Sequence, residues 1–438
     1  MWRIMLPASL QSMVNMGVGI LGTVMVGGLG ETAIAAASLG NQFVFFFMIC
    51  CFGVGGGAMV MTSQYMGKGD IPAVKQVITL AIRIILVFAF LFTLVTFFVP
   101  QGIMRIYTPE ADVIAVGALY LQIIAFQFIF MGLGTTLAII GRSFGVVRVP
   151  LIASVLSFAA AAFFNWVFIF GNLGAPRMEI AGAALATVIA RFIEFAVVAG
   201  YLFFAEKRVR YRLKDLLKPC GQLIPEYLRI GSPVIIGDLI LAFGTTALAM
   251  IWGWLGSAMA AANAIIMVAT QLAGVFIMGM SNASSIMVGT AIGENDLQKA
   301  EARGFTYLLL SAVLGLISSV AILIFTPILL IFYDIEPETL LILDGLMWAM
   351  VAAMPFHVIS NVLTKGVLRG GGDTKFLMVA DVLFMWVASI PLGYLAGFVL
   401  FLSPFWIAVL LRVDLLIKSI WCIIRMWQKK WLHVVKSV

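Results

Sequence analysis

Two carboxylates, Asp238 and Asp381, stand in long apolar stretches with no opposite charge three or four residues away in either direction. Those are the positions that share a helix face. A carboxylate in such surroundings can bind and release a proton near neutral pH, or hold Na⁺ or a cationic substrate. The competing interpretation is that each lies near an interface and reaches water. Asp381 follows Lys375 by six residues, about 9 Å of helix rise, and this short distance from a loop lysine favours the interpretation of a position near the interface.

Other charges in apolar stretches have a partner on their own helix. Glu194 is three residues from Arg191, and Asp414 is four residues from Lys418. Each pair can neutralise itself, so a structural role and a transport role are both open. Glu194 is the only acidic residue deep in the first half of the chain, which makes it a further candidate for binding a coupling ion or substrate.

Enzyme and metal chemistry find little support. The four cysteines and two histidines show no zinc-ligand spacing, and no H-E-x-x-H, P-loop or G-x-S-x-G motif occurs. Gly370-Gly-Gly-Asp373 and Tyr333-Asp334 match the motif pair of intramembrane aspartyl proteases, but a helix predicted over 337–366 places them on opposite membrane faces. We therefore expect no enzyme, no metal, no cofactor and no ATP-driven pump.

The composition predicts a polytopic membrane protein. Of 438 residues, 63% are hydrophobic and 11% charged, against about 45–50% and about 25% in soluble domains. A membrane helix needs about 20 mainly apolar residues. Twelve such stretches are predicted, at 3–27, 33–62, 73–98, 111–140, 150–170, 179–204, 228–254, 257–290, 300–325, 337–366, 377–398 and 403–427.

Loop charges predict the orientation. Twelve spans put both termini on one side, and most of the 27 Lys and Arg residues fall in loops of that side. The opposite loops hold only Arg105 and Arg177. The positive-inside rule then places both termini in the cytoplasm, with the protein in the cell membrane. The basic balance is a topology signal, and we expect no nucleic-acid partner.

The chain repeats itself at a fixed offset. Adding 226 to a residue number in the first half lands on its counterpart for Pro7/Pro233, Gly30/Gly256, Gly53/Gly279, Gly67/Gly293 and Asp70/Asp296. Six spans per half make the repeat parallel, as in transporters whose halves rock around a shared site. We predict an N-terminal lobe (1–204), a basic cytoplasmic linker (205–227), a C-terminal lobe (228–427) and a cytoplasmic tail (428–438).

The segments that carry the resemblance to a known family lie along nearly the whole chain. They are Gly22-Thr-Val-Met-Val-Gly-Gly-Leu-Gly30 with Gln42, Gln64-Tyr-Met-Gly-Lys-Gly-Asp70, Asn165-Trp-Val-Phe-Ile-Phe-Gly171, Ile180-Ala-Gly-Ala-Ala-Leu-Ala-Thr187, Leu255-Gly-Ser-Ala-Met-Ala-Ala-Ala-Asn263 and Leu368-Arg-Gly-Gly-Gly-Asp-Thr-Lys375. Together they resemble the multidrug and toxic compound extrusion (MATE) family. The resemblance implies an all-α fold of twelve transmembrane helices in two six-helix lobes.

The resemblance also implies a function, namely export of amphipathic, often cationic, organic compounds in exchange for H⁺ or Na⁺, by a monomer in the lipid bilayer. The candidate coupling-ion or substrate-binding residues are Asp238, Asp381, Glu194, Asn165, Asn263 and Gln42. The amides are also suited to interhelical hydrogen bonds.

One position departs from the family pattern. Many members carry an aspartate linked to cation coupling where this chain has Gly22. The alternative function is that of a lipid-linked oligosaccharide flippase from the same broad superfamily. Those proteins often have more spans and a cationic cavity, whereas the candidate charges here are mainly acidic.

Overall fold

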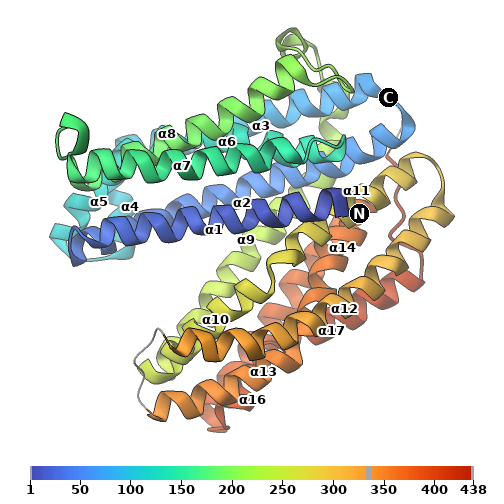
Figure 1. The fold of residues 1–438 in the computed structure, drawn as a ribbon. Coiled ribbons are helices and arrows are strands. Elements are labelled where there is room, and N and C mark those ends of the chain that lie inside the picture. The colour runs from blue at the N-terminus through green and yellow to red at the C-terminus, as the bar shows by residue number, and fades with distance from the viewer. Residues whose placement is uncertain (1, 332–336, 436–438) are drawn as a thin grey trace. The chain divides into compact units, whose positions relative to one another are not determined.

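The computed structural model describes residues 2–331 and 337–435, and helices make up most of these ranges, with no strand among them (Figure 1). The predicted all-α fold is confirmed. Tyr333-Asp334 and the last three residues of the predicted tail lie outside the described residues.

The first half contains eight α-helices and a connecting segment of short turns. They are α1 (Trp2–Gly27), α2 (Glu31–Lys68), α3 (Ile71–Phe98), α4 (Pro100–Tyr107), α5 (Ala111–Ile124), α6 (Gln127–Ser143), α7 (Arg148–Phe170), η1 (Asn172–Gly174), α8 (Glu179–Gly200), η2 (Tyr201–Ala205), η3 (Leu213–Leu217) and η4 (Gly221–Leu223).

The second half has more interruptions, several of them π-helical turns. Its elements are α9 (Ile224–Trp254), α10 (Ser257–Ala273), α11 (Val275–Gly293), α12 (Leu297–Leu330), α13 (Pro337–Val362), η5 (Leu363–Leu368), α14 (Thr374–Leu383), η6 (Phe384–Ser389), α15 (Ile390–Tyr394), η7 (Leu395–Val399), α16 (Pro404–Leu410) and α17 (Val413–Trp427).

The predicted spans correspond to these helices, with three interruptions. Ten helices of the described residues are long and apolar enough to cross a membrane, or up to eleven if the bent pair α5 and α6, 55° apart, is one span. The predicted span 257–290 is divided at Gly274 into α10 and α11, and 403–427 is divided into α16 and α17 by a turn at Leu411 and Arg412.

The internal repeat extends to the conformation of the turns. Before α3, Gly69 has φ +75° and the Asp70 carboxylate accepts a hydrogen bond from the Ala73 N–H at 3.0 Å. The equivalent turn before α12 has Asn295 at φ +60°, and Asp296 accepts from the Lys299 N–H at 2.9 Å. Left-handed residues also recur in the pairs Gly30 and Gly256, and Gly145 and Gly372. The two halves therefore share their turns as well as their apolar pattern.

The described chain divides into two compact units. One comprises Met1–Ser9, Ser63–Lys68 and Ser232–Ser437, and the other comprises Leu10–Thr62 and Gly69–Gly231. The first unit has a core of buried aliphatic side chains around Leu346 and Val358. In the second, the rings of Phe47, Phe92 and Phe128 pack with centroids 4.9 to 5.7 Å apart. Each unit therefore has a core of its own.

Helix α12 illustrates the surface that faces lipid. Leu309, Leu316 and Val320 are 69%, 61% and 56% exposed. The opposite side of the helix is small and buried, with Ser311 and Gly315 packed against its neighbours. An apolar exposed stripe on a long helix suits hydrocarbon, so this is a multi-pass membrane protein.

Small residues set how closely α12 and α13, which lie side by side in Figure 1, approach each other. A Cβ atom added to Gly315 would lie 2.6 Å from the Cα atom of Pro355, closer than real Cβ contacts allow. Membrane helices commonly use such small residues for close packing, because lipid supplies no hydrophobic force between helices.

We expect Gly315→Ala to lower the free energy of unfolding by about 1–3 kcal/mol, because the backbones of α12 and α13 must separate. Gly253→Ala, in α9, is the control, since an added Cβ there meets nothing within 4 Å. Thermal unfolding of the detergent-solubilised variants measures the difference. Equal melting temperatures for the two variants would contradict the packing argument.

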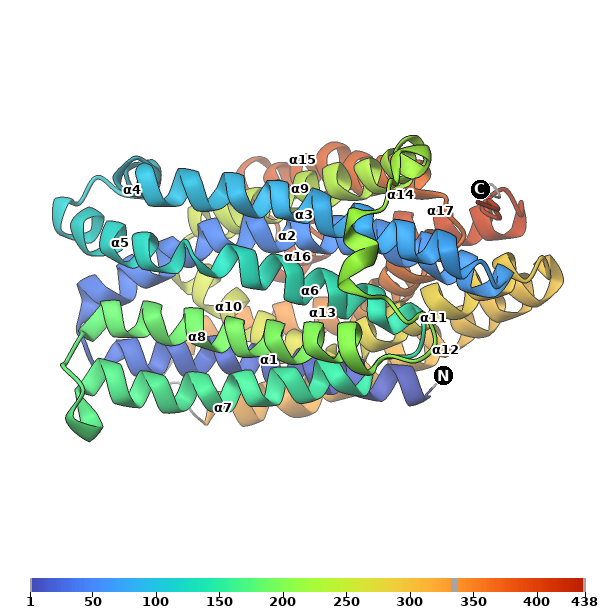
Figure 2. The ribbon, with the colours of Figure 1, turned by 90° about the horizontal axis from the view of Figure 1, so that it is seen from above.

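The segment between α8 and α9 is anchored to α3 by ion pairs and hydrogen bonds, and Figure 2 shows it crossing that helix. The buried Asp215 carboxylate pairs with Lys75 Nζ at 3.0 Å and Lys218 Nζ at 2.6 Å. Arg83 donates to the Leu216 carbonyl oxygen at 2.6 Å. Burial raises the pKa of Asp215, but the hydrogen bonds from Lys218 and Lys75 outweigh it and lower the pKa to about 2.

A lowered pKa means that Asp215 contributes stability above its unfolded value of about 3.9, and that this stability is lost as pH falls toward 2. We expect pepsin to cleave residues 205–227 increasingly as pH falls from about 4 to about 2. The Asp215→Asn variant should already be cleaved at the upper end of this range and change little below it. Parallel cleavage profiles for the two proteins, measured by mass spectrometry, would rule out this role of Asp215.

Candidate functional site

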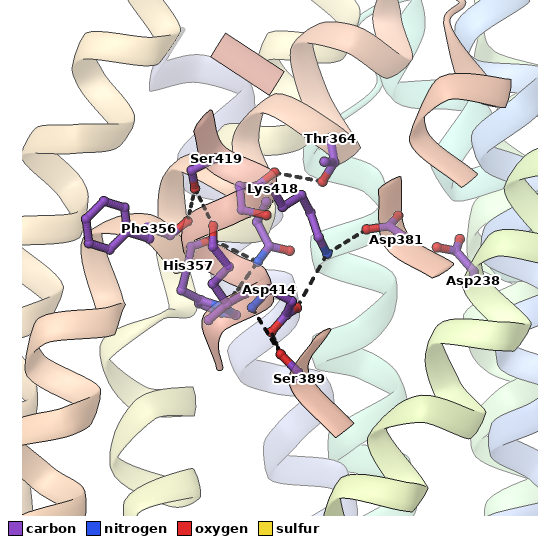
Figure 3. A network of polar contacts seen from close by, with 12 residues as sticks. Asp238, Phe356, His357, Thr364, Asp381, Ser389, Asp414, Lys418 and Ser419 are labelled. Atoms are coloured by element: carbon purple, nitrogen blue, oxygen red, sulfur yellow. Dashed lines mark hydrogen bonds and ion pairs between the residues drawn. The ribbon is translucent and has the colours of Figure 1, made fainter. Parts of the chain in front are cut away.

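The carboxylates of Asp238 in α9 and Asp381 in α14 line the same small cavity. Its volume is about 10 Å³, roughly the room that one water needs. Arg369 and Thr374 complete its polar lining. Figure 3 shows the two carboxylates on neighbouring helical segments. Residues more than a hundred positions apart therefore form one polar site.

Two glycines bring α9 close to the continuous segment formed by α14 and η6. Cβ atoms added to Gly237 and Gly244 would lie 3.3 Å from the Cα atom of Met378 and 2.2 Å from the sulfur of Met385. The glycines are seven residues apart, as are the methionines, so the contact repeats after two helical turns. This close approach places Asp238, next to Gly237, beside Asp381.

Lys418 of α17 is the counter-ion of Asp381. Its Nζ atom lies 2.7 Å from Asp381 Oδ1 and 3.9 Å from Asp414 Oδ2. The Ser389 hydroxyl of η6 donates to Asp414 Oδ1 at 2.8 Å and accepts from the Asp414 N–H at 3.0 Å. All four side chains are buried (Figure 3). One ammonium group thus serves two buried carboxylates, and it is closer to the one on another helix.

Asp238 also has a counter-ion, since Arg369 Nη2 lies 3.5 Å from its Oδ1. Neither Asp238 nor Asp381 has an opposite charge three or four residues away on its own helix, and the tertiary structure supplies a counter-ion to each. Their partners are 131 and 37 residues away along the chain, beyond the helix neighbours that the sequence reveals. This finding concerns their pairing and leaves their proposed role in transport open.

The repeat offers a signal for Arg369 that sequence analysis did not use. Arg142 is its equivalent in the first half, offset by 227, and Arg142 Nη2 donates to Gln11 Oε1 in α1 at 2.7 Å. In each half, the arginine of this turn thus bonds to the first helix of that half. Only in the second half is its partner a carboxylate, which makes the two halves chemically unequal.

A histidine and two hydroxyl residues extend the network. The Asn361 amide nitrogen donates to the His357 carbonyl oxygen at 3.0 Å and lies 3.5 Å from both ring nitrogens. Ser419 Oγ lies 2.8 Å from the Phe356 carbonyl oxygen. The Ser419 contact joins α17 to α13, whereas the Asn361 contacts lie within α13. Ser389 and Ser419 are residues of the network that sequence analysis missed.

The first-half candidate Glu194 is paired as its spacing predicted. Arg191 Nη1 donates to Glu194 Oε2 at 2.7 Å, and the Ser154 hydroxyl of α7 lies 3.4 Å from Oε1. Glu194 is buried in α8, between this hydroxyl and its own helix partner. The structure confirms the pairing within the helix.

The amide candidates lie elsewhere. Asn165 is buried in α7, Asn263 is buried in α10, and Gln42 is exposed on α2. None of them lines the cavity of Asp238 and Asp381. Among the described residues, no group of three His, Cys, Asp or Glu side chains is placed to hold a metal ion.

Comparison with known proteins places this architecture in a family. The family model described as MatE matches residues 7–167 and again residues 233–395, and the two matches start 226 residues apart, the offset that relates the two halves. The chain belongs to the MATE family. Among its relatives, this MATE protein is 26% identical to a probable multidrug resistance protein NorM of Agrobacterium fabrum, over 92% of its own length and 90% of the relative's.

Other relatives and solved structures agree with this assignment. Identity to the multidrug resistance protein NorM of Aliivibrio fischeri is 25%, over 89% of this MATE protein and 85% of the relative. A crystal structure of MATE in complex with MaL6 has a TM-score of 0.87 at 18% identity, covering 98% and 96% of the two chains. A MOP superfamily transporter from Pyrococcus furiosus has a TM-score of 0.86 at 18% identity, covering 98% and 95%. At this identity, these structures confirm the fold.

We expect Lys418→Met to destabilise this MATE protein by about 3–5 kcal/mol, because it leaves Asp381 and Asp414 buried without their cation. The additional change Asp381→Asn should restore part of the loss. Lys299→Met removes an ammonium from the exposed pair with Glu294 and should cost at most about 1 kcal/mol. Thermal unfolding in detergent compares them, and a Lys418→Met protein that melts like Lys299→Met would exclude Lys418 as the essential counter-ion.

Proposed function

We propose that this MATE protein is a secondary antiporter that exports amphipathic, often cationic, organic compounds in exchange for H⁺ or Na⁺. The observation that carries the proposal is the cavity shared by Asp238 and Asp381, with Arg369 and Lys418 as internal counter-ions. Buried ionisable groups in membrane helices are costly and mark ion or proton pathways. The names of the relatives, multidrug resistance proteins, support the drug-like substrate class.

The geometry supports a mechanism of competition between cations. In the described conformation, Asp381 is neutralised by Lys418, which also lies 3.9 Å from Asp414. A proton bound by Asp381 removes its attraction for the ammonium, and Lys418 then has Asp414 as its remaining carboxylate partner. An incoming cation changes the pairing in the same way. Ion binding thereby alters the contact between α14 and α17, which is the kind of two-state element that coupling requires.

The internal counter-ions favour H⁺ over Na⁺ as the coupling ion. Na⁺ gains carboxylate ligands only by displacing Arg369 from Asp238 or Lys418 from Asp381, whereas a proton binds a single carboxylate oxygen. The position linked to coupling in the first half of many members is Gly22, so Glu194 is the acidic candidate there. We propose that Asn165, Asn263 and Gln42 contribute hydrogen bonds to the substrate path.

We propose that transport takes place in the cell membrane with both termini of the protein in the cytoplasm, an orientation that the loop charges support. Its lobes, 1–204 and 228–427, alternate access as a monomer, and the linker 205–227 and the tail from 428 lie on the cytoplasmic side. No cofactor and no catalytic step are part of the cycle.

Efflux of a fluorescent lipophilic cation from cells that make the protein tests this function, with a proton gradient and a Na⁺ gradient imposed separately. We expect the proton gradient alone to drive export. Asp381→Asn and Asp238→Asn should each reduce the initial rate at least about tenfold. This corresponds to an activation free energy of the rate-limiting step that is higher by about 1.4 kcal/mol or more.

Glu294→Gln is the matched control, because it removes a carboxylate from an exposed ion pair in the same half of the chain. Membrane abundance must be equal for all variants. Full export by both aspartate variants refutes the assigned site. Export driven only by the Na⁺ gradient refutes H⁺ as the coupling ion and still supports an antiporter. Absence of export under either gradient favours the oligosaccharide flippase instead.

A further inference from the structure

A strongly basic hollow lies between the start of α3 and the segment that follows α8. Its volume is about 580 Å³, and five of its eight lining residues are cationic. These are Lys75, Lys207, Arg208, Arg210 and Lys218. Among the described residues that line it, none is acidic. The volume is within the range of about 300–1,000 Å³ that small-ligand sites occupy.

The acidic groups nearby hold the backbone and the rim of the hollow. The buried Glu206 carboxylate accepts hydrogen bonds from the backbone N–H groups of Arg208 at 2.5 Å, Val209 at 2.9 Å and Arg210 at 2.8 Å. Its charge is therefore used to fix the loop 207–210, in which Arg210 has φ +53°. Asp215 likewise holds Lys75 and Lys218.

The remaining cations are positioned without a carboxylate partner. Lys207, Arg208 and Arg210 take part in none of the ion pairs found among residues 2–331 and 337–435. Arg208 is oriented by a bond from Nη1 to the Phe144 carbonyl oxygen at 3.0 Å. Membrane orientation requires only that a loop carry positive charge, in any conformation. In this protein the loop 207–210 has a fixed conformation around the hollow, which holds cations near one another although like charges repel. Membrane orientation alone therefore does not explain the arrangement.

The chemistry of this arrangement suits a phosphate group. Guanidinium groups bind phosphate oxygens through paired hydrogen bonds, and lysines add point charges. We infer that the hollow lined by Lys207, Arg208 and Arg210 binds a phosphate-bearing anion, and that the headgroup of an anionic phospholipid is its source.

Apolar side chains on the same segment favour the lipid source over free phosphate. Phe204, Leu213 and Leu217 are 75%, 55% and 87% exposed. The segment follows the span Glu179–Ala205 and precedes the span Gly221–Trp254, so these side chains lie at the level of a membrane interface. Basic residues beside exposed apolar anchors are typical of segments that bind anionic lipid. This inference does not depend on the transport mechanism.

Thermal unfolding of the full-length protein in neutral detergent tests the inference, with short-chain phosphatidylglycerol and inorganic phosphate as separate ligands. We expect phosphatidylglycerol to raise the melting temperature saturably. The variant Lys207→Gln/Arg210→Gln should bind it roughly tenfold to thirtyfold more weakly, as the loss of two cations near a membrane surface implies. The charge-conserving variant Lys207→Arg/Arg210→Lys should retain binding within a few-fold.

The control Lys214→Gln/Lys430→Gln removes the same charge from exposed lysines that do not line the hollow. It should bind phosphatidylglycerol like the unmodified protein. Saturation by inorganic phosphate at equal or lower concentration, with the same dependence on Lys207 and Arg210, would identify free phosphate as the ligand. Equal weakening in Lys207→Gln/Arg210→Gln and in the control Lys214→Gln/Lys430→Gln, or no stabilisation by either ligand, would overturn the site. If Lys207→Gln/Arg210→Gln fails to fold, Lys207→Gln alone gives the same comparison.

Discussion

A charge buried among membrane helices needs a counter-charge, and Lys418 fulfils this condition for two carboxylates at once. Its ammonium group lies 2.7 Å from Asp381 and 3.9 Å from Asp414. The bond from Ser389 to Asp414 ties η6 into the same cluster. These polar contacts therefore hold α14, η6 and α17 together, because leaving any of the buried charges without its partner is costly. Any step that changes the charge on Asp381 must also rearrange this contact, so the charge state of Asp381 is linked to helix packing.

The duplicated architecture carries different chemistry in its two halves. Equivalent arginines occupy the same turn, but Arg142 bonds to the neutral Gln11 while Arg369 pairs with Asp238. A parallel repeat supplies matched scaffolds, and a few side chains then decide which half carries the buried carboxylate partner of this arginine. The cluster of Asp238, Asp381 and Asp414 is in the second half.

Acidic side chains serve a structural purpose in the basic segment between the halves. Glu206 bonds to backbone N–H groups, and Asp215 holds two lysines. Because both carboxylates already have partners within the fold, Lys207, Arg208 and Arg210 remain as an excess of positive charge on the surface. The positive-inside pattern and the basic hollow are thus two consequences of the same residues, one set by composition and the other by the bonds that fix the loop.

The amino-acid sequence determined the features that depend on near neighbours and on hydropathy. Apolar stretches located the membrane helices, the offset of 226 revealed the repeat, and spacing gave the Arg191–Glu194 pair. Interruptions such as the division of α10 from α11 at Gly274 were not evident, because a hydropathy average does not register a single turn.

Only the tertiary structure decided which cation neutralises which carboxylate. Helix spacing identifies partners three or four residues away, whereas Asp381 and Asp238 find theirs at separations of 37 and 131 residues. The close contact of Gly237 with Met378 then brings both carboxylates to one cavity. Such contacts arise from how helices pack, and packing depends on the shapes of both surfaces together rather than on the pattern along either one.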